Sequence, residues 1–222
     1  MKKILIKYAS RQRPDKFARG MDSIMKATNK SRITVLVSLD KDDPELLQYH
    51  RVMDHNPDLR VICLIGTSYG KIDAINRDMH TLQDWDILVN FSDDMVFTVD
   101  GWDDIIEQQF TDEPLFLHLP DGHQNENIST MSIMNKAYYN QDGYIYHPSY
   151  KSLWCDVEAT EVAKLRGQHK YVDVRIFDHL HVAWGKAEWD ALYVKNENRE
   201  LWNHDEQVYH TRKANNYELQ PK

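Results

Sequence analysis

The sequence predicts an α/β sandwich with a mostly parallel central sheet. Up to Phe91, four short apolar runs alternate with helix-like patterns, and this alternation is typical of repeated strand–helix–strand units. The runs are rich in Ile, Val and Leu, as expected of strands that are buried on both faces. Each run ends in a polar segment, and in such sheets the ligand sites lie beyond the carboxyl ends of the strands.

The expected elements of the first half follow from these runs and from the apolar spacing between them. In chain order they are a strand at 4–8, a helix over 17–25, a strand at 33–39, a helix over 45–53, a strand at 60–65, a helix over 72–82 and a strand at 87–91. The strand at 33–39 is the clearest, because its β-branched residues end at a turn that contains Pro44.

The second half is less regular. The expected elements are a helix over 102–110, strands at 115–119 and 129–134, helices over 136–140 and 156–166, and a strand-like segment over 171–182. Gly167 follows the 156–166 helix at the position where glycine commonly ends one. The tail from Lys195 is too polar to assign, although it could fold over a bound ligand.

Composition favours one domain. No Pro-, Gly- or Ser-rich linker divides the 222 residues. Cys63 and Cys155 match no metal-binding spacing, which favours reduced thiols in a cytoplasmic protein, with a disulfide as the alternative. The apolar start is interrupted at Lys7, so it is too short for an export signal or a membrane span.

The charge is unevenly distributed along the chain. Residues 1–41 carry eleven Lys or Arg against three Asp, whereas the remainder carries sixteen Lys or Arg against thirty-two acids. Two oppositely charged solvated surfaces would explain this pattern. A nucleoside diphosphate with its cation would also explain it, because the basic part would bind the anion and the acidic part the metal.

The adjacent acids Asp93 and Asp94 are the strongest candidate for the metal. They follow the strand at 87–91, within a stretch from Asp78 to Asn135 that holds thirteen acids and no Lys or Arg. An Asp pair is also a common turn signal. Carboxylates without a nearby cation suit a hard divalent metal such as Mg²⁺ or Mn²⁺, which takes oxygen ligands and bridges to phosphate.

Three polar features are expected at the same edge of the sheet. Asp40, Gly70-Lys71 and Asp93-Asp94 each follow a predicted parallel strand. The glycine and lysine before a helix would suit a phosphate. They do not form a Walker A loop, because Gly66 is only four residues before Gly70 and Ile72 stands where a hydroxyl is needed.

The order of these motifs resembles that of a known family. The motifs are the first strand with its polar loop, Asp40, Gly70-Lys71-Ile72-Asp73-Ala74-Ile75-Asn76, Ser92-Asp93-Asp94-Met95 followed by Gly101-Trp102, Trp154-Cys155-Asp156-Val157-Glu158, and His179-Leu180-His181. From about residue 3 to about residue 193, the chain resembles the GT-A-fold nucleotide-sugar glycosyltransferases, particularly the family 2-like enzymes. The resemblance implies a Rossmann-like GT-A sandwich with a nucleotide-binding half (1–100), an acceptor and catalytic half (101–194) and a C-terminal tail (195–222).

The resemblance assigns the nucleotide sugar to a set of polar residues. They are Ala9, Ser10, Arg11, Arg13, Asp40, Gly70, Lys71, Asn76, Asp93 and Lys186. Asp40 would accept a hydrogen bond from the base edge, or it could instead cap the following turn. Arg11 or Arg13 would pair with phosphate.

The metal would be Mn²⁺ or Mg²⁺, bound where the family carries its Asp-x-Asp motif. Asp94 would bind it directly, and Asp93 would contact the ribose or a metal-bound water; Met95 replaces a third acid seen in many members. His179 and His181 lie two apart, so on a strand both would point to one face, and either could complete the coordination.

A carboxylate is also expected as the catalytic base. Asp156 matches the family's acid motif and Glu158 is the nearby alternative. A helix cap is the other interpretation of Asp156.

The resemblance thus implies a metal-dependent, inverting transfer of a sugar from a UDP- or GDP-type donor to an acceptor hydroxyl, expected to be a saccharide. A nucleotidyltransferase and a non-catalytic nucleotide- or sugar-binding module are the alternatives. The first is disfavoured because residues 8–14 contain no glycine. A nucleic-acid acceptor is a minor alternative, because the acidic remainder would repel a phosphate backbone.

Overall fold

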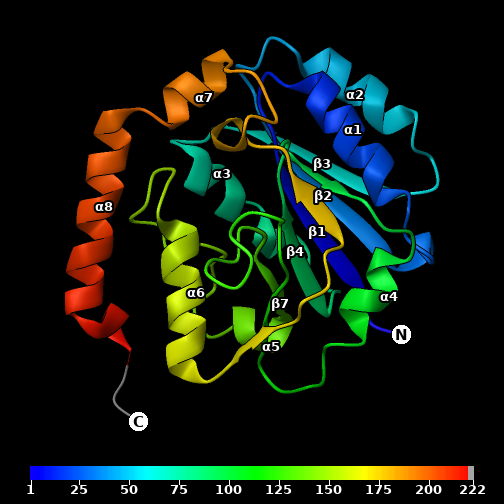
Figure 1. Ribbon diagram of the computed structural model, residues 1–222. Helices are drawn as coiled ribbons and strands as arrows, with labels where there is room; N and C mark the ends of the chain where they lie inside the picture. Colours follow the sequence, from blue (N-terminus) through cyan, green and yellow to red (C-terminus); the bar gives the residue numbers. More distant parts are fainter. Residues whose placement is uncertain (220–222) are drawn as a thin grey trace.

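The computed structural model describes residues 1–219 and confirms the predicted α/β architecture (Figure 1). Its central sheet has seven strands in the order β3-β2-β1-β4-β7-β6-β8. These strands are β1 (Ile4–Ala9), β2 (Ile33–Asp40), β3 (Arg60–Gly66), β4 (Ile87–Phe91), β6 (Phe116–His118), β7 (Ile133–Asn135) and β8 (His169–Tyr171). Two short strands, β5 (Met95–Phe97) and β9 (Phe177–His179), form a separate ladder.

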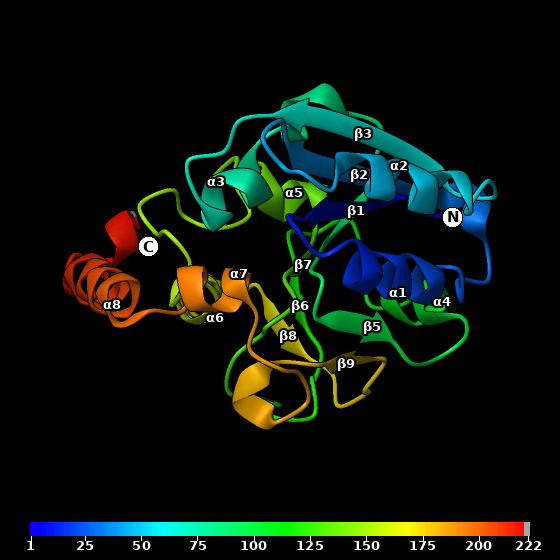
Figure 2. The same ribbon diagram turned by 90° about the horizontal axis from the view of Figure 1, so that it is seen from above.

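Helices lie on both sides of this sheet (Figure 2). They are α1 (Pro14–Ile24), α2 (Leu46–Asp54), α3 (Lys71–Asn76), α4 (Trp102–Glu107), α5 (Lys136–Tyr139), α6 (Cys155–Arg166), α7 (Ala191–Asn196) and α8 (Arg199–Ala214). Single 3₁₀ turns are η1 (Lys30–Arg32), η2 (Met79–Thr81), η3 (Val182–Trp184) and η4 (Asn216–Glu218). Successive residues of β1 alternate between the two cores, with Ile4 and Ile6 on one side and Leu5 on the other.

The register of the parallel strands brings four loops to one edge. β1 pairs in parallel with β2 and β4, and β2 pairs in parallel with β3. At their carboxyl ends Ala9 lies opposite Ser38, Asp40 opposite Gly66, and Tyr8 opposite Phe91. The polar residues that follow these strands are therefore neighbours in space, as the sequence predicted.

The segment predicted as one strand over 171–182 is divided in the structure. β8 joins the main sheet beside β6, whereas β9 pairs antiparallel with β5 and places Met95 opposite His179. The residues between them include the exposed Val174, so this stretch lacks a continuous buried face. The pairing of β9 brings a histidine from the second half next to the acids that follow β4.

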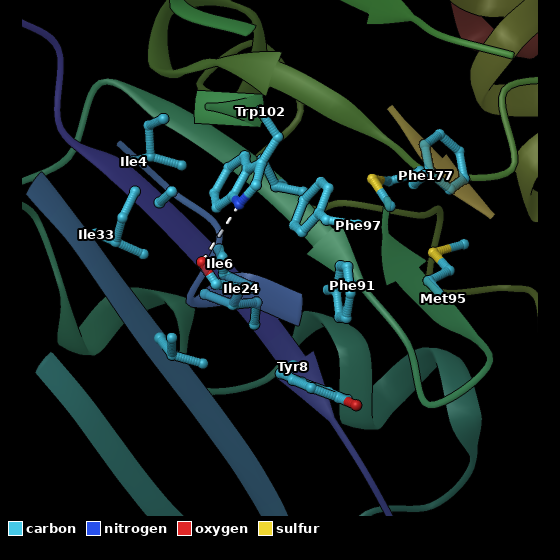
Figure 3. Packing of buried hydrophobic residues seen from close by; sticks show 14 of the residues in the cluster. Ile4, Ile6, Tyr8, Ile24, Ile33, Phe91, Met95, Phe97, Trp102 and Phe177 are labelled. Carbon is cyan, nitrogen blue, oxygen red and sulfur yellow. Dashed lines mark hydrogen bonds between the residues drawn. The ribbon is translucent and has the colours of Figure 1, made fainter. Parts of the chain in front are cut away.

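Aromatic packing fixes the segment that carries these acids (Figure 3). The ring of Trp102 stacks on Phe97 with centroids 4.0 Å apart, and Phe97 stacks on Phe91 at 5.0 Å. The Trp102 indole N–H donates to the carbonyl of Ile24 at 3.3 Å. Phe91 precedes Asp93 and Asp94 in the chain, and Phe97 follows them. Because both rings are packed in the core, the segment that carries the two acids is fixed at both ends.

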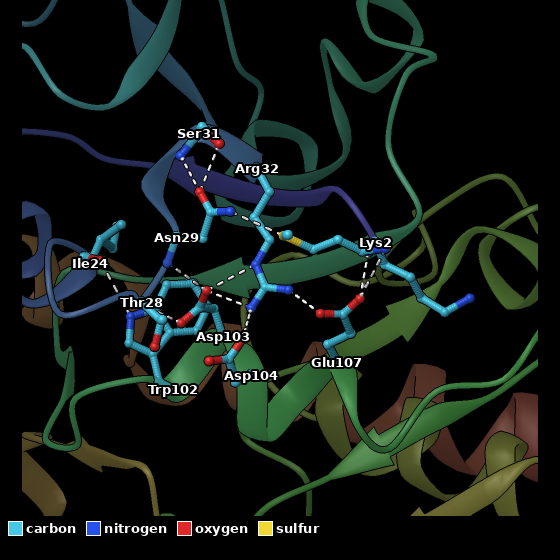
Figure 4. A network of polar contacts seen from close by, with 11 residues as sticks. Lys2, Ile24, Thr28, Asn29, Ser31, Arg32, Trp102, Asp103, Asp104 and Glu107 are labelled. Carbon is cyan, nitrogen blue, oxygen red and sulfur yellow. Dashed lines mark hydrogen bonds and ion pairs between the residues drawn. The ribbon is translucent and has the colours of Figure 1, made fainter.

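A buried ion pair ties α4 to the turn before β2 (Figure 4). The Arg32 guanidinium donates to Asp103 Oδ2 from Nε at 2.9 Å and from Nη2 at 2.5 Å, and the Thr28 N–H donates to Asp103 Oδ1 at 2.7 Å. The Asp103 side chain is 0% exposed, whereas that of Asp104, which pairs with the same guanidinium, is 45% exposed.

We expect Asp103→Ala to lower the free energy of unfolding by about 3–5 kcal/mol, because it leaves the Arg32 charge buried with its main partner removed. Urea denaturation measures this loss. Asp104→Ala is the matched control and should cost about 0–1 kcal/mol, since a half-exposed pair is screened by solvent. Equal losses in the two variants would show that the pair does not anchor α4.

In the structure the C-terminal tail begins at Asp190, before the predicted start at Lys195, and it forms α7 and α8. Residues 220–222 of the predicted 195–222 tail lie outside the described residues. Cys63 and Cys155 are both free, so no disulfide joins them. Among residues 1–219, no helix combines the length and the apolar character needed to cross a bilayer.

Candidate active site

A pocket of about 280 Å³ opens at the carboxyl edge of β1 to β4. Nine of the residues assigned from sequence line it: Ala9, Ser10, Arg11, Arg13, Asp40, Gly70, Lys71, Asp93 and Asp94. Other lining residues were not predicted from the sequence, among them Ser38, Thr67, Ser68, Leu192, Tyr193 and Glu197. Three of these come from the tail, which covers one side of the pocket.

Asp40 lies between two guanidinium groups at one end of the pocket. Arg11 Nη1 donates to Asp40 Oδ2 at 3.0 Å, and Arg77 Nη1 lies 3.5 Å from Asp40 Oδ1. The following turn is capped by another acid, because Asp43 accepts from the Glu45 N–H at 2.8 Å. The carboxylate that caps this turn is thus that of Asp43, whereas the Asp40 carboxylate pairs with Arg11 and Arg77.

Asp93 is buried at the base of the pocket. It accepts a hydrogen bond from Ser10 Oγ at 2.8 Å. Burial raises the pKa of Asp93 to about 7, although the Ser10 hydroxyl and the Arg13 charge both act to lower it. Near neutral pH this carboxyl can therefore be present in both its protonated and its ionised form.

Asp94 extends toward the second half of the chain. It accepts hydrogen bonds from Ser92 Oγ and from the Tyr193 hydroxyl, the latter at 3.2 Å, and its Oδ2 lies 3.5 Å from His179 Nε2. Burial alone would raise the pKa of Asp94, but the contact with His179 outweighs it and holds this pKa well below its usual range. Asp94 therefore stays ionised.

His179 lies between two carboxylates. Its Nε2 faces Asp94, and its Nδ1 lies 3.3 Å from Asp121 Oδ2. Burial alone would lower the pKa of His179, but the two carboxylates raise it to about 9. Asp121 was not predicted from sequence, although it follows the strand expected at 115–119 much as Asp40 follows its strand.

His181 takes a different position from the one expected of a strand residue. β9 ends at His179, and His181 is the N-cap of η3, where its Nδ1 accepts from the Ala183 N–H at 3.2 Å. Its Nε2 lies 2.7 Å from Glu197 Oε1, although its ring is only 5.2 Å from that of His179. Of the predicted ligands, the structure thus brings Asp94 and His179 together directly.

These two side chains fit a divalent cation. Ligand atoms about 2.1 Å from an octahedral ion, at right angles to each other, lie about 3 Å apart, close to the 3.5 Å between Asp94 Oδ2 and His179 Nε2. No cluster of three or more His, Cys, Asp or Glu in residues 1–219 is arranged to hold a metal alone. Such a site suits an ion that takes its other ligands from phosphate and water.

Two basic side chains face the tail, Arg13 at the N-cap of α1 and Lys16 in its first turn. Arg13 donates to Asp190 from Nε at 3.0 Å and from Nη2 at 2.6 Å, Lys16 Nζ donates to the same carboxylate at 2.7 Å, and the Arg13 guanidinium lies over the Tyr193 ring at 4.0 Å. The tail is held over the pocket by these contacts.

The side chains of Asp156 and Glu158 have different partners, although both residues lie in the first turn of α6. Asp156 accepts from the Val157 N–H at 2.9 Å, and burial raises the pKa of its carboxyl against the opposing charges of Lys71 and His179. Glu158 is buried elsewhere, where it accepts from Arg212 Nε at 2.9 Å and from the Tyr150 hydroxyl at 2.7 Å. Asp156 thus lies within electrostatic reach of the pocket, and Glu158 joins α6 to α8.

Six of the predicted residues do not line the pocket: Asn76, Asp156, Glu158, His179, His181 and Lys186. Asn76 instead binds the 145–146 backbone, donating to the Tyr146 carbonyl at 2.6 Å and accepting from the Ile145 N–H at 2.9 Å. Lys186 is exposed beyond η3.

No protein-family model matches the sequence, and no curated protein matches it significantly. Solved structures do match its fold. The mannosyltransferase PcManGT from Pyrobaculum calidifontis, in complex with GDP-Man and Mn²⁺, superposes with a TM-score of 0.64 at 10% identity, over 78% of this chain and 55% of that one. The chain has a GT-A fold.

Two further GT-A structures agree with this result. TarS 1–349 from S. aureus, in complex with UDP-GlcNAc, gives a TM-score of 0.62 at 14% identity, over 79% of this chain and 57% of that one. Glucosyl-3-phosphoglycerate synthase from Mycobacterium tuberculosis, in complex with Mn²⁺, UDP and phosphoglyceric acid, gives a TM-score of 0.55 at 12% identity. The match covers 81% of this chain and 71% of that one. The chain spans little more than half the length of the first two proteins.

Proposed function

We propose that this chain is a metal-dependent, inverting glycosyltransferase that moves a sugar from a nucleoside diphosphate sugar to an acceptor hydroxyl. The observation that carries the proposal is the contact between Asp94 and His179, in which His179 Nε2 lies 3.5 Å from Asp94 Oδ2. Asp94 lines a pocket that is also lined by Asp40 and Lys71. Proteins of the same fold have been solved with GDP-Man and Mn²⁺, with UDP-GlcNAc, and with UDP and Mn²⁺.

The nucleotide would extend along the carboxyl edge of the sheet. Asp40 would accept from the base, Asp93 from the ribose, and Arg13 and Lys71 would donate to the diphosphate. In the structure the Arg13 guanidinium pairs with the Asp190 carboxylate. A diphosphate would therefore exchange with that carboxylate on binding.

Asp94 and His179 would hold Mn²⁺ or Mg²⁺. When bound there, the cation would act as a Lewis acid that neutralises the charge of the departing diphosphate. The neighbouring Ser92 hydroxyl donates to Asp94 and fixes the orientation of its carboxylate.

Asp156 would act as the general base. Its carboxylate would take the proton of the acceptor hydroxyl while that oxygen attacks the anomeric carbon on the face opposite the diphosphate, which inverts the configuration. A carboxyl whose pKa is raised by burial is better matched to this task than a fully solvated one. We further propose that residues 1–222 act as one domain, because the site draws on both halves of the chain. We also propose that it is located in the cytoplasm, where its two free thiols would stay reduced.

We expect UDP or GDP to be released from the matching sugar donor when Mn²⁺ and a saccharide acceptor are both present, and EDTA to abolish this release. A coupled assay for nucleoside diphosphate measures it across a panel of donors. Release of pyrophosphate would instead indicate a nucleotidyltransferase, and tight binding without any product would indicate a binding module. The anomeric proton coupling of the product tests inversion.

A further inference from the structure

Asp121 lies directly behind His179, in the loop that follows β6. Its carboxylate is 1% exposed, and its Oδ2 is 3.3 Å from His179 Nδ1. The opposite ring nitrogen of His179, Nε2, faces Asp94. The histidine is thus held from one side by a carboxylate and presents its other nitrogen to Asp94, which lines the pocket.

The two carboxylate oxygens of Asp121 have different hydrogen-bond partners. Oδ1 accepts from the backbone N–H groups of His123 at 2.8 Å and Gln124 at 2.7 Å. Oδ2 faces His179 and also accepts from the Thr130 hydroxyl at 3.1 Å. Because two backbone donors fix Oδ1, the carboxylate cannot rotate, and Oδ2 is the oxygen left for the histidine.

We infer that Asp121 is a positioning residue that keeps the proton of His179 on Nδ1 and leaves the Nε2 lone pair for the divalent cation. Ligating histidines generally donate their second ring nitrogen to a carboxylate or carbonyl in this way, which fixes both the tautomer and the ring plane. The inference rests on the cation site of the proposed function, and it adds a residue that does not itself touch the cation or the substrate.

Asp121→Asn tests this role through the tautomer. The amide oxygen should take the place of Oδ1, because only an acceptor satisfies the two backbone N–H groups there. The amide NH₂ then faces His179 Nδ1 and donates to it, which moves the ring proton to Nε2 and blocks its lone pair. We expect the Kd of the apoprotein for Mn²⁺ to rise about 10–100-fold.

A spectroscopic signature separates this role from a purely structural one. At saturating Mn²⁺, pulsed EPR of the wild type should show modulation from a bound imidazole nitrogen, and Asp121→Asn should lack it. Thr130→Val is the matched control, since it removes the other donor to the same oxygen and should keep both the Mn²⁺ affinity, within about threefold, and the nitrogen signal. His179→Gln gives the baseline without the ligand.

The outcomes distinguish this inference from the proposed function. Wild type that binds no Mn²⁺ overturns the cation site and this inference with it. Wild type that binds Mn²⁺, with Asp121→Asn keeping its affinity and nitrogen signal, overturns the inference alone. If Asp121→Asn does not fold, ¹⁵N NMR of Zn²⁺-loaded wild type decides the matter: a proton on Nδ1 of His179 supports the role, and a proton on Nε2 contradicts it.

Discussion

Asp94→Ala should lower the turnover of sugar transfer by about 10³-fold or more. The substitution removes the only carboxylate that the structure places 3.5 Å from His179 Nε2 within residues 1–219, and with it the cation that would neutralise the departing diphosphate. That neutralisation is worth several kcal/mol in the transition state, and each 1.36 kcal/mol corresponds to a factor of about ten in rate. Initial rates at saturating donor and Mn²⁺ measure the loss.

Asp100→Ala is the matched control for this variant. Asp100 is an exposed acid on the same segment, so its removal changes the charge by the same amount without touching the pocket, and we expect a rate close to that of the wild type. Unchanged turnover in Asp94→Ala would count directly against a cation bound by this residue.

Asp156→Asn should lower kcat by about 10²–10⁴-fold while the Kd of the donor changes by less than about threefold. The amide has the same shape and can still accept from the Val157 N–H, but it cannot take the proton of the acceptor hydroxyl. Steady-state kinetics combined with calorimetric binding of the nucleoside diphosphate measure the two quantities separately.

Glu158→Gln is the matched control for the base. This neighbouring acid pairs with Arg212 and Tyr150, so its replacement should destabilise the contact between α6 and α8 and leave the kcat of folded protein near that of the wild type. The reverse pattern, with kcat lost in Glu158→Gln and kept in Asp156→Asn, would transfer the role of base to Glu158.

The first half of the chain, residues 1–100, could be predicted closely from the sequence. The four predicted parallel strands agree with β1 to β4 to within about one residue at each end, because strands buried on both faces leave long runs of Ile, Val and Leu. The meeting of Asp40, Lys71 and Asp94 at one edge followed from the same reasoning, since the carboxyl ends of neighbouring parallel strands share that edge.

The tail could not be predicted, because polar contacts rather than an apolar stripe hold it. Asp205 of α8 is 0% exposed and accepts from three successive backbone N–H groups, Lys151 at 3.0 Å, Ser152 at 2.8 Å and Leu153 at 2.7 Å. Asp190 pairs with Arg13, which lies 177 positions away in the chain. No local pattern of residues indicates such contacts.

The direction in which individual side chains point was also difficult to predict from the sequence. Asp156 and Glu158 are two residues apart on a helix, about 200° around its axis, so one can face the pocket while the other faces α8. His179 and His181 were expected to share a strand face, but β9 ends between them. In both pairs the packing alone decides the direction: Glu158 pairs with Arg212 of α8, and His179 rather than His181 lies beside Asp94.

The dependence of nucleotide affinity on the cation tests the central claim most directly. Isothermal titration of UDP and of GDP into the wild type, with saturating Mn²⁺ and with EDTA, gives the coupling between the two ligands. We expect at least one of the nucleotides to bind about 5–150-fold more tightly with Mn²⁺, the range usual for coupled sites, because the cation joins Asp94 and His179 to the diphosphate. Equal affinity for both nucleotides with and without Mn²⁺ would contradict a cation bridge at this site.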